Sequence, residues 1–376
     1  MKRWMMSVLI ALIAVGLLVN STRADDIKIG AVFPFTGQAA LYAEDAKRAL
    51  ELAQDEVNME GGIRGKKVKF IYEDDAGTPK GGVSAVQKLI EIDKVDAIVG
   101  SIFSSVVMAM KPIVTAHKVV LLAPMASHPD IYSGTKYIIS LTPTDNDNTY
   151  VNAKYCTQVL KKKTLAILYM LNDTGIASGG FMVKWWEHFG GKVLVQESYT
   201  PGSTDFRTQL TKIREANPDV TFMCVTWREA VNILKQFSEM NLKCHVTANS
   251  QVREPKLLEL VGQVAEGMNC TTEYIGGTED DRKLRDKFEK EITARYKQPP
   301  QIVAYNTYDC TRALFEALRR GATKGESLRN TIVSLDIPGV YGHIRFREDG
   351  SPKGDTAMWV VKDGKFVELN YVDCAP

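Results

Sequence analysis

The chain has 376 residues, of which 45% are hydrophobic and 24% are charged. This length exceeds what one hydrophobic core usually fills, so we expect two domains. The 47 Lys and Arg residues nearly balance the 45 Asp and Glu residues, which gives no electrostatic basis for binding nucleic acid or an anionic membrane.

Residues 1–24 have the pattern of a cleaved signal peptide. Lys2 and Arg3 precede the apolar run Met5–Val19, and small residues precede a cleavage point after Ala24. An apolar run of about 15 residues is short for a helix that must cross ~30 Å of hydrocarbon. No cysteine lies near the cleavage point, which argues against a lipid anchor. We therefore predict a protein of the periplasm, with no membrane insertion after cleavage.

From Asp26 onward the sequence alternates strand and helix patterns. Short apolar runs predict strands at Ile27–Phe33, Val68–Tyr72, Ala97–Gly100 and Val119–Ala123. Helical spacing of apolar residues lies between them, over 46–57 and 83–90. Continuous apolar strands are typical of a parallel sheet that is covered on both faces, so this part is predicted to be a doubly wound α/β unit.

The same alternation restarts after the polar stretch Thr142–Asn148. Strands are predicted at Leu165–Tyr169, Val193–Val195 and Val220–Val225, with helices at Phe181–Phe189 and Phe206–Glu215. The later chain carries helices at Asp280–Tyr296 and Tyr308–Gly321 and ends in two hairpin-like turns, at Glu348–Gly350 and Lys362–Gly364. The overall fold class is therefore α/β, with two doubly wound parallel sheets in succession.

The six cysteines do not form a recognisable site. They are Cys156, Cys224, Cys244, Cys270, Cys310 and Cys374, with no CxxC pair and no metal-like spacing to a histidine. An oxidising compartment permits disulfides, but their pairing cannot be read from the sequence. Cys224 lies in a predicted strand, where a buried free thiol is at least as plausible as a bridge.

Motifs of the common enzyme classes are missing from the sequence, and we expect no cofactor, no metal and no enzymatic activity. Gly61–Gly65 follows a helix and precedes a strand, the reverse of a phosphate-binding loop, so it predicts a turn with positive φ. The pair Asp74–Asp75 ends a strand. We interpret it as a helix-entry loop with a capping carboxylate.

Hydroxyl groups and backbone amides cluster where strands of the first unit end. The segments are Thr36–Tyr42, Ser101–Ser105 and Ala123–Ser127, and ligands of open α/β sheets lie beyond such strand ends. Ser104 is expected to be a helix N-cap or a ligand contact, and the two roles are compatible. The pattern predicts a site where hydroxyl and amide groups hold a carboxylate.

These segments resemble the leucine/isoleucine/valine-binding proteins, the receptor family of branched-chain amino acid ABC transporters. The markers follow one another in the family's order: Ile27–Gly37, Gly61–Lys66, Tyr72–Asp75 with Pro79, Val99–Ser105, Pro124 with Ser127, Asn306–Tyr308 and Phe346–Gly350. The resemblance implies a type I periplasmic binding protein-like fold, with two lobes joined by a three-strand hinge that closes on the ligand. It places lobe 1 at 25–144 plus 274–345, and lobe 2 at 145–273 plus 346–376.

The resemblance also implies the binding residues. They are Tyr42, Ser104, Ser105, Met125 (through its backbone), Ser127 and Tyr305 in the first lobe, and Thr174, Thr226, Trp227 and Ser250 in the second. Trp227 and Tyr305 are expected either to stack a planar ligand or to pack at the rim of the site. Arg228 is expected to hold a second carboxylate or to be a solvated residue at a helix start.

The second lobe departs from the family pattern. Ser250 stands where amino-acid receptors place a carboxylate for the ligand's ammonium group, although Glu229 or Glu254 could substitute in a shifted register. A buried ammonium group without an anionic partner costs several kcal/mol. The sequence therefore argues against an ordinary α-amino acid as the ligand.

We expect the protein to be the receptor of an ABC importer, which captures a small carboxylate-bearing solute (an amino acid or an aromatic or organic acid) and delivers it to an inner-membrane permease. The alternative is a ligand-sensing regulatory protein of the same fold. An exported enzyme is the third hypothesis. The sequence leaves the solute, the permease, the disulfide pairing and the oligomeric state open.

Overall fold

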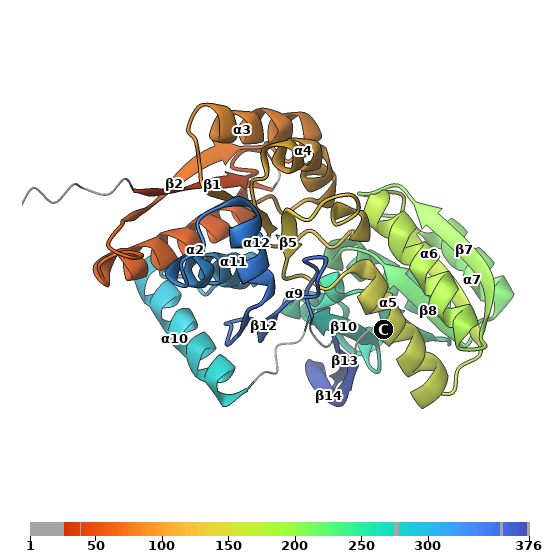
Figure 1. Cartoon of the computed structure of the whole chain (residues 1–376). Coiled ribbons are helices and arrows are strands. Elements are labelled where there is room, and N and C mark those ends of the chain that lie inside the picture. Colours follow the sequence, from red (N-terminus) through yellow and green to blue (C-terminus); the bar gives the residue numbers. More distant parts are fainter. Residues whose placement is uncertain (1–25, 38, 274–277, 354–355, 374–376) are drawn as a thin grey trace, which may run out of the picture.

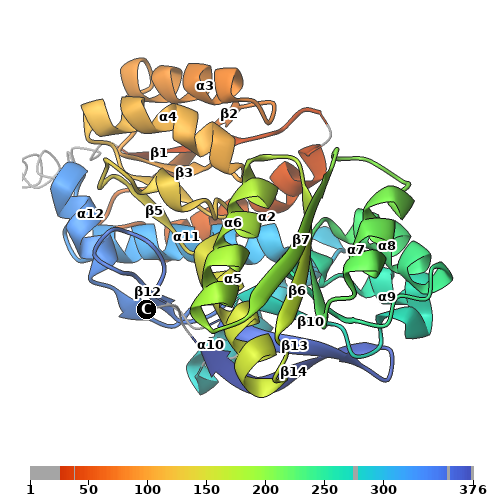
Figure 2. The ribbon, with the colours of Figure 1, turned by 90° about the vertical axis from the view of Figure 1, so that its right-hand side faces the viewer.

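The computed structural model describes residues 26–37, 39–273, 278–353 and 356–373. The chain forms two α/β lobes, and the second contains the C-terminal strands (Figures 1 and 2). The predicted signal peptide and Cys374 lie outside the described residues.

The first lobe is built on a five-stranded parallel sheet with the order β2-β1-β3-β4-β5. Its strands are β1 (Ile27–Phe33), β2 (Val68–Asp74), β3 (Ala97–Gly100), β4 (Leu121–Ala123) and β5 (Ile138–Ser140). Its helices are α2 (Ala40–Met59), α3 (Pro79–Glu91), α4 (Ser104–His117), α10 (Glu279–Tyr296), α11 (Ile302–Arg319) and α12 (Gly325–Val333).

Alternation along β1 explains why helices cover both faces of this sheet. Ile29, Ala31 and Phe33 point to a core shared with α2, α10 and α11, while Val32 points to a second core shared with α3 and α4. All four side chains are fully buried. Successive strand residues face opposite sides of a sheet, so a strand buried on both faces needs a continuous apolar run.

The second lobe contains a seven-stranded sheet with the order β14-β13-β10-β9-β8-β6-β7. Its strands are β6 (Thr164–Met170), β7 (Lys192–Tyr199), β8 (Val220–Cys224), β9 (His245–Ala248), β10 (Asn269–Glu273), β13 (Thr356–Lys362) and β14 (Lys365–Asp373). Its helices are α5 (Asp145–Lys154), which runs into a π-helical turn (Tyr155–Val159), α6 (Asp173–His188), α7 (Arg207–Ala216), α8 (Trp227–Glu239) and α9 (Pro255–Val261).

This second sheet is mixed, whereas the alternation pattern predicted a parallel one. Strands β6 to β10 pair in parallel, but β13 pairs antiparallel with β10 and with β14. The two-residue turn Asp363-Gly364 joins β13 to β14, and both residues have positive φ (52° and 69°). A two-residue turn of this kind returns the chain antiparallel, which is the hairpin expected at this position.

The chain passes between the two lobes three times. It crosses from β5 to α5, from β10 to α10, and from the short hairpin β11 (Asp336–Ile337) and β12 (Ile344–Arg345) to β13. The first and third crossovers touch each other, because Arg347 forms an ion pair with Asp147 at 3.4 Å and Ser140 donates from its amide to the carbonyl of Gly350 at 3.2 Å. Three crossovers, two of them in contact, are the arrangement expected of a hinge between two lobes.

The glycine-rich segment after α2 is a turn, as predicted. Gly61, Gly62, Arg64 and Gly65 all have positive φ. A Cβ at Gly62 would lie 2.1 Å from the carbonyl oxygen of Lys66, so only glycine fits there. The segment reverses the chain between α2 and β2 and is no phosphate loop.

The five cysteines within the described residues are all free, and Cys224 is fully buried in β8. None of the described helices is long and apolar enough to cross a membrane. The described residues also contain no group of three or more His, Cys, Asp or Glu side chains placed to hold a metal ion.

Candidate solute-binding site

Ser104 begins α4 just beyond the end of β3, but it does not cap the helix. The N-cap is Phe103, which makes no side-chain cap. The Ser104 side chain instead turns to the loop after β4, where its Oγ accepts a hydrogen bond from the amide of His128 at 3.3 Å. Since the oxygen acts as acceptor in this bond, its own hydrogen is directed elsewhere and can be donated to a ligand.

The start of α4 offers further donors. Among the described residues, no acceptor takes the amide hydrogens of Ser104 or Ser105, and the first turn has no acidic residue. Both serines are half-buried. Unpaired amides at the positive end of a 14-residue helix favour an anion. Together with the Ser104 hydroxyl they form a donor group suited to a carboxylate.

The backbone carbonyl of Met125, in the loop after β4, is an acceptor beside these donors. Hydrogen bonds to the residues before and after Met125 hold this loop in place. The carbonyl of Pro124 accepts from Thr142 Oγ1 at 2.7 Å, and that of Ala126 accepts from Ser140 Oγ at 3.1 Å. The Met125 carbonyl between them has no donor within the described residues. A fixed loop thus presents one free backbone acceptor, at the residue expected to contact a ligand through its backbone.

Asp145 is a candidate site residue that sequence reasoning did not name. It begins α5 at the first crossover, is 9% exposed, and its Oδ2 accepts from Ser127 Oγ at 3.4 Å. Asp145 also lies close to Cys224, the last residue of β8. Burial of the Cys224 thiol and, second to it, the negative charge of Asp145 raise the pKa of that thiol to about 12. Asp145 therefore lies between the loop of one lobe and a strand end of the other, where it can face a cation. Its position in the polar stretch between the two α/β units was the available signal.

The predicted second-lobe residues stand at helix starts. Thr174 is the second residue of α6, Thr226 is the N-cap of α8, and Ser250 opens a short 3-10 turn after β9. Parallel strands place these helix starts at one edge of the sheet. Each residue is half-buried, but the Thr226 hydroxyl is already bonded to Glu229 in the capping box of α8.

Glu229 is a structural residue and not a substitute for the missing second-lobe acid. Its buried carboxylate accepts four hydrogen bonds, from Tyr199 Oη (2.8 Å), the amide of Gly202 (2.8 Å), and the amide and Oγ1 of Thr226 (3.2 and 3.0 Å). This set includes a capping box for α8. The other proposed substitute, Glu254, caps α9 by accepting from the amide of Lys256.

The aromatic residues of the prediction are spread over both lobes. Tyr42 lies in the first turn of α2 and is 49% exposed. Tyr305 is half-buried in lobe 1, where its hydroxyl donates to Glu289 at 2.7 Å. Trp227 packs on the core of lobe 2 with the Arg228 guanidinium 5.3 Å from its ring centre. Tyr305 and Trp227 thus have contacts within their own lobes.

Exposed apolar side chains gather at the strand ends of both lobes. Of the eleven large exposed hydrophobic residues in the described chain, five follow a strand of one sheet or the other: Leu41, Tyr42, Phe103, Leu171 and Ile176. Single exposed apolar residues are normal on a protein surface. Several exposed apolar side chains at the strand ends of a sheet, where ligands of this fold class lie, are typical of a binding site. The two edges are suited to an apolar portion of a ligand.

Asp74 and Asp75 prove to be turn residues, and neither caps α3. The N-cap of that helix is Thr78. Asp74 accepts from Thr36 Oγ1 at 2.6 Å and from the amide of Ala76, and Asp75 accepts from the amide of Gly77 at 2.7 Å. Burial alone would raise the pKa of Asp74, but the bonds from Thr36 and Ala76 lower it overall. These bonds fix the loop beside β1, while burial raises the pKa of Asp75.

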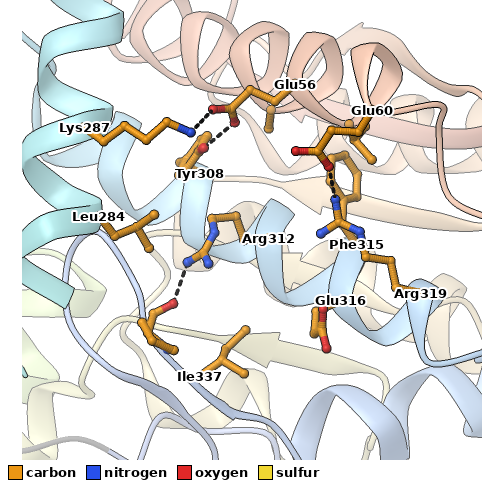
Figure 3. A pocket seen from close by; sticks show the side chains of 13 residues that line it. Glu56, Glu60, Leu284, Lys287, Tyr308, Arg312, Phe315, Glu316, Arg319 and Ile337 are labelled. Atoms are coloured by element: carbon orange, nitrogen blue, oxygen red, sulfur yellow. Dashed lines mark hydrogen bonds and ion pairs between the residues drawn. The ribbon is translucent and has the colours of Figure 1, made fainter. Parts of the chain in front are cut away.

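A separate groove lies on lobe 1 between α2, α10 and α11, with a cavity volume of about 340 Å³ (Figure 3). Its charges are paired across it: Glu56 with Lys287 at 3.3 Å, and Glu60 with Arg319 at 3.1 Å. None of the predicted site residues lines it. The candidate site therefore remains at the strand ends, where the amides that begin α4 and the Met125 carbonyl have no partner within the described residues.

Comparison with known proteins gives a consistent result. A family model described as periplasmic binding protein matches residues 26–365. The Leu/Ile/Val-binding protein BraC3 of Rhizobium johnstonii is 26% identical over 336 residues, which cover 86% of this chain and 88% of that protein. The predicted resemblance to the leucine/isoleucine/valine-binding proteins is confirmed.

Solved structures confirm the predicted fold. A leucine-binding protein of Thermotoga maritima superposes with a TM-score of 0.80 at 22% identity, covering 92% of this chain and 99% of that one. A solute-binding protein of an ABC transporter from R. palustris, solved with benzoate, superposes with a TM-score of 0.78 at 19% identity, covering 93% and 97%.

Proposed function

The chain belongs to the periplasmic binding protein family, and on this premise we propose that it is the periplasmic receptor of an ABC importer that captures a small carboxylate-bearing solute between its lobes. One observation carries the proposal: the hydroxyl of Ser104 and the amides of Ser104 and Ser105 form an unpaired donor group at the start of α4. A carboxylate needs such donors and no counter-charge from Lys or Arg.

The groups beside the donors suggest the rest of the ligand. The Met125 carbonyl, the Ser127 hydroxyl and the Asp145 carboxylate are acceptors, which suit an ammonium group next to the carboxylate. The apolar residues at both edges suit a hydrophobic side chain. This combination favours an apolar α-amino acid over a simple aromatic acid, in contrast to the expectation from the sequence, because Asp145 offers the carboxylate that position 250 lacks. The name of the Rhizobium relative agrees with it.

Closure of the two lobes follows from the same arrangement. Donors lie on lobe 1, hydroxyls at helix starts lie on lobe 2, and Asp145 lies at the crossover. A ligand that contacts both lobes only in the closed form stabilises that form by its differential affinity. The closed receptor would then dock on an inner-membrane permease.

Isothermal titration calorimetry on protein refolded free of carried-over ligand tests the function. Branched-chain and aromatic amino acids, their des-amino analogues, and benzoates form the panel. We expect binding of at least one apolar amino acid, and weaker binding of its des-amino analogue. If no member of the panel binds to the refolded protein, the proposed ligand class is wrong.

A further inference from the structure

Asn152 is a fully buried polar side chain in α5, the helix that begins with Asp145. α5 and α6 lie side by side on one face of the second sheet (Figure 2), and their buried residues pack there with apolar side chains of β6 and β8. A side-chain amide without hydrogen-bond partners would be costly in these surroundings, so its contacts indicate what holds the helix in place.

The side-chain amide of Asn152 is bonded throughout to strands of this sheet. Its Nδ2 donates to the carbonyl of Ala248 at 3.1 Å and to Thr271 Oγ1 at 3.3 Å. Its Oδ1 accepts from Thr247 Oγ1 at 2.8 Å and from Asn269 Nδ2 at 3.4 Å. A side-chain amide has two N–H groups and one oxygen with two lone pairs, so this set fills its capacity. We call Asn152, Thr247, Asn269 and Thr271 the Asn152 network.

The Asn152 network fixes α5 to the body of lobe 2. β9 contributes its last two residues, and the neighbouring β10 contributes Asn269 and Thr271, which share one face of the sheet. Bonds from one side chain to two paired strands determine where the helix lies along the sheet and how it is turned about its own axis. A contact with α6 adds to them, because Trp185 Nε1 donates to Asn146 Oδ1 at 3.0 Å.

The same helix carries Asp145 to the boundary between the lobes. Asn152 follows Asp145 by about two helical turns, which places both residues on one side of α5 with their Cα atoms about 10 Å apart. The helix between them is continuous, and Thr149 Oγ1 donates to the carbonyl of Asp145 at 2.7 Å. A position fixed at Asn152 is therefore passed on to Asp145, whose Oδ2 accepts from Ser127 Oγ of lobe 1 at 3.4 Å.

The donors for the acid group of a ligand do not depend on α5. The Ser104 hydroxyl and the amides of Ser104 and Ser105 belong to α4 in lobe 1. A shift of α5 would change the distance between Asp145 and a bound ammonium group and would leave the contacts of the carboxylate in place. The two groups of a ligand can therefore be tested separately.

We propose that Asn152 is a positioning residue for amino-group recognition: through its network it holds α5 so that the Asp145 carboxylate faces the ammonium group of a ligand whose acid group lies at the start of α4. Asn152 thus sets selectivity for α-amino acids over des-amino acids without touching the ligand. The role in recognition rests on the proposed function, whereas the hold of the network on α5 does not.

Four substitutions test the network. Asn152→Leu keeps the approximate size of the side chain and removes all of its bonds, whereas Thr271→Val removes one acceptor of Nδ2. Thr271→Ser retains that hydroxyl and should behave as the wild type. Thr221→Val is the matched control, because Thr221 is a fully buried threonine of β8 whose hydroxyl lies 3.2 Å from Cys244 Sγ and outside the network.

Amide hydrogen exchange without ligand measures the hold on α5. Relative to the amides of α8 in the same lobe, we expect the amides of residues 149–154 to lose protection by about tenfold in Asn152→Leu and about threefold in Thr271→Val. Thr271→Ser and Thr221→Val should leave α5 as it is in the wild type. Unchanged protection of α5 in both network variants would overturn the hold, whether or not a ligand binds. If Asn152→Leu does not fold, Thr271→Val decides alone.

Calorimetry with leucine and 4-methylpentanoate, or with the best-binding amino acid of the panel and its des-amino analogue, measures the selectivity. We expect the ratio of the two affinities to fall by at least about tenfold in Asn152→Leu and about threefold in Thr271→Val, with the analogue unaffected. The ratio should stay unchanged in Thr271→Ser and Thr221→Val. An unchanged ratio in the folded network variants, or equal losses for both ligands, would overturn the positioning role. Wild-type protein that binds no member of the panel would refute the proposed function, and the exchange result would then decide the hold on α5 by itself.

Discussion

Asp145→Asn is the change that separates the ammonium site from the carboxylate site. The substitution keeps the size of the side chain and an oxygen that can accept from Ser127 Oγ, now 3.4 Å from Asp145 Oδ2. It removes one negative charge from a group that is only 9% exposed. Loss of one partner of a buried charge pair costs about 2–5 kcal/mol, which weakens binding by at least about thirtyfold.

Calorimetric titration with a matched pair of ligands measures this loss. The pair is the best-binding amino acid of the panel and its des-amino analogue, for example leucine and 4-methylpentanoate. We expect the amino acid to lose at least about thirtyfold in affinity and the analogue to lose little, because only the amino acid carries an ammonium group. Asp173→Asn, at an exposed acid in the first turn of α6, controls for net charge and should leave both affinities unchanged. Equal losses for both ligands, or no loss for the amino acid, would refute the role of Asp145.

Three further changes test other parts of the account. Ser104→Ala combined with Ser127→Ala should weaken binding by a few kcal/mol for both ligands of the pair, and unchanged affinity would move the anion site elsewhere. Glu229→Ala should destabilise the protein by about 3 kcal/mol in urea unfolding, since it leaves several buried donors unpaired, and an unchanged midpoint would contradict its structural role. Burial, opposed by a nearby arginine, raises the pKa of both Asp45 and Asp309 to about 6. The folded state then holds these protons more tightly than the unfolded chain. The contribution of the two carboxyl groups to the free energy of unfolding therefore rises as pH falls from about 7 to about 4. Asp45→Asn should make the free energy of unfolding depend less on pH in this range, as measured by urea titrations at several pH values.

Much of the fold follows from local pattern. Continuous apolar runs such as Ile27–Phe33 and Val220–Cys224 became strands buried on both faces, and the turn at Gly61–Gly65 formed as expected. The local pattern did not predict that the β13–β14 pair joins the second sheet antiparallel, because a hairpin signal at Asp363-Gly364 says which strands are neighbours but not which sheet they join. Only the family resemblance assigned residues 346–376 to lobe 2.

The candidate site was predicted in part. The strand-end rule placed Ser104, Met125 and Ser127 in adjacent loops, and the structure brings Ser104 and the loop after Ser127 into contact. Asp145 was taken only as part of the polar stretch Thr142–Asn148, because its nearness to Ser127 depends on the path of the first crossover and not on sequence spacing. Glu229 was considered as an ammonium partner, because a sequence does not show that four donors already occupy a carboxylate.

A crystal structure of the protein with its co-purified solute tests the central claim most directly. We expect a carboxylate within hydrogen-bond distance of Ser104 Oγ and of the amides that begin α4, with the lobes closed over it. A bound solute whose acid group lies away from Ser104, or one held in the groove between α2, α10 and α11, would contradict it.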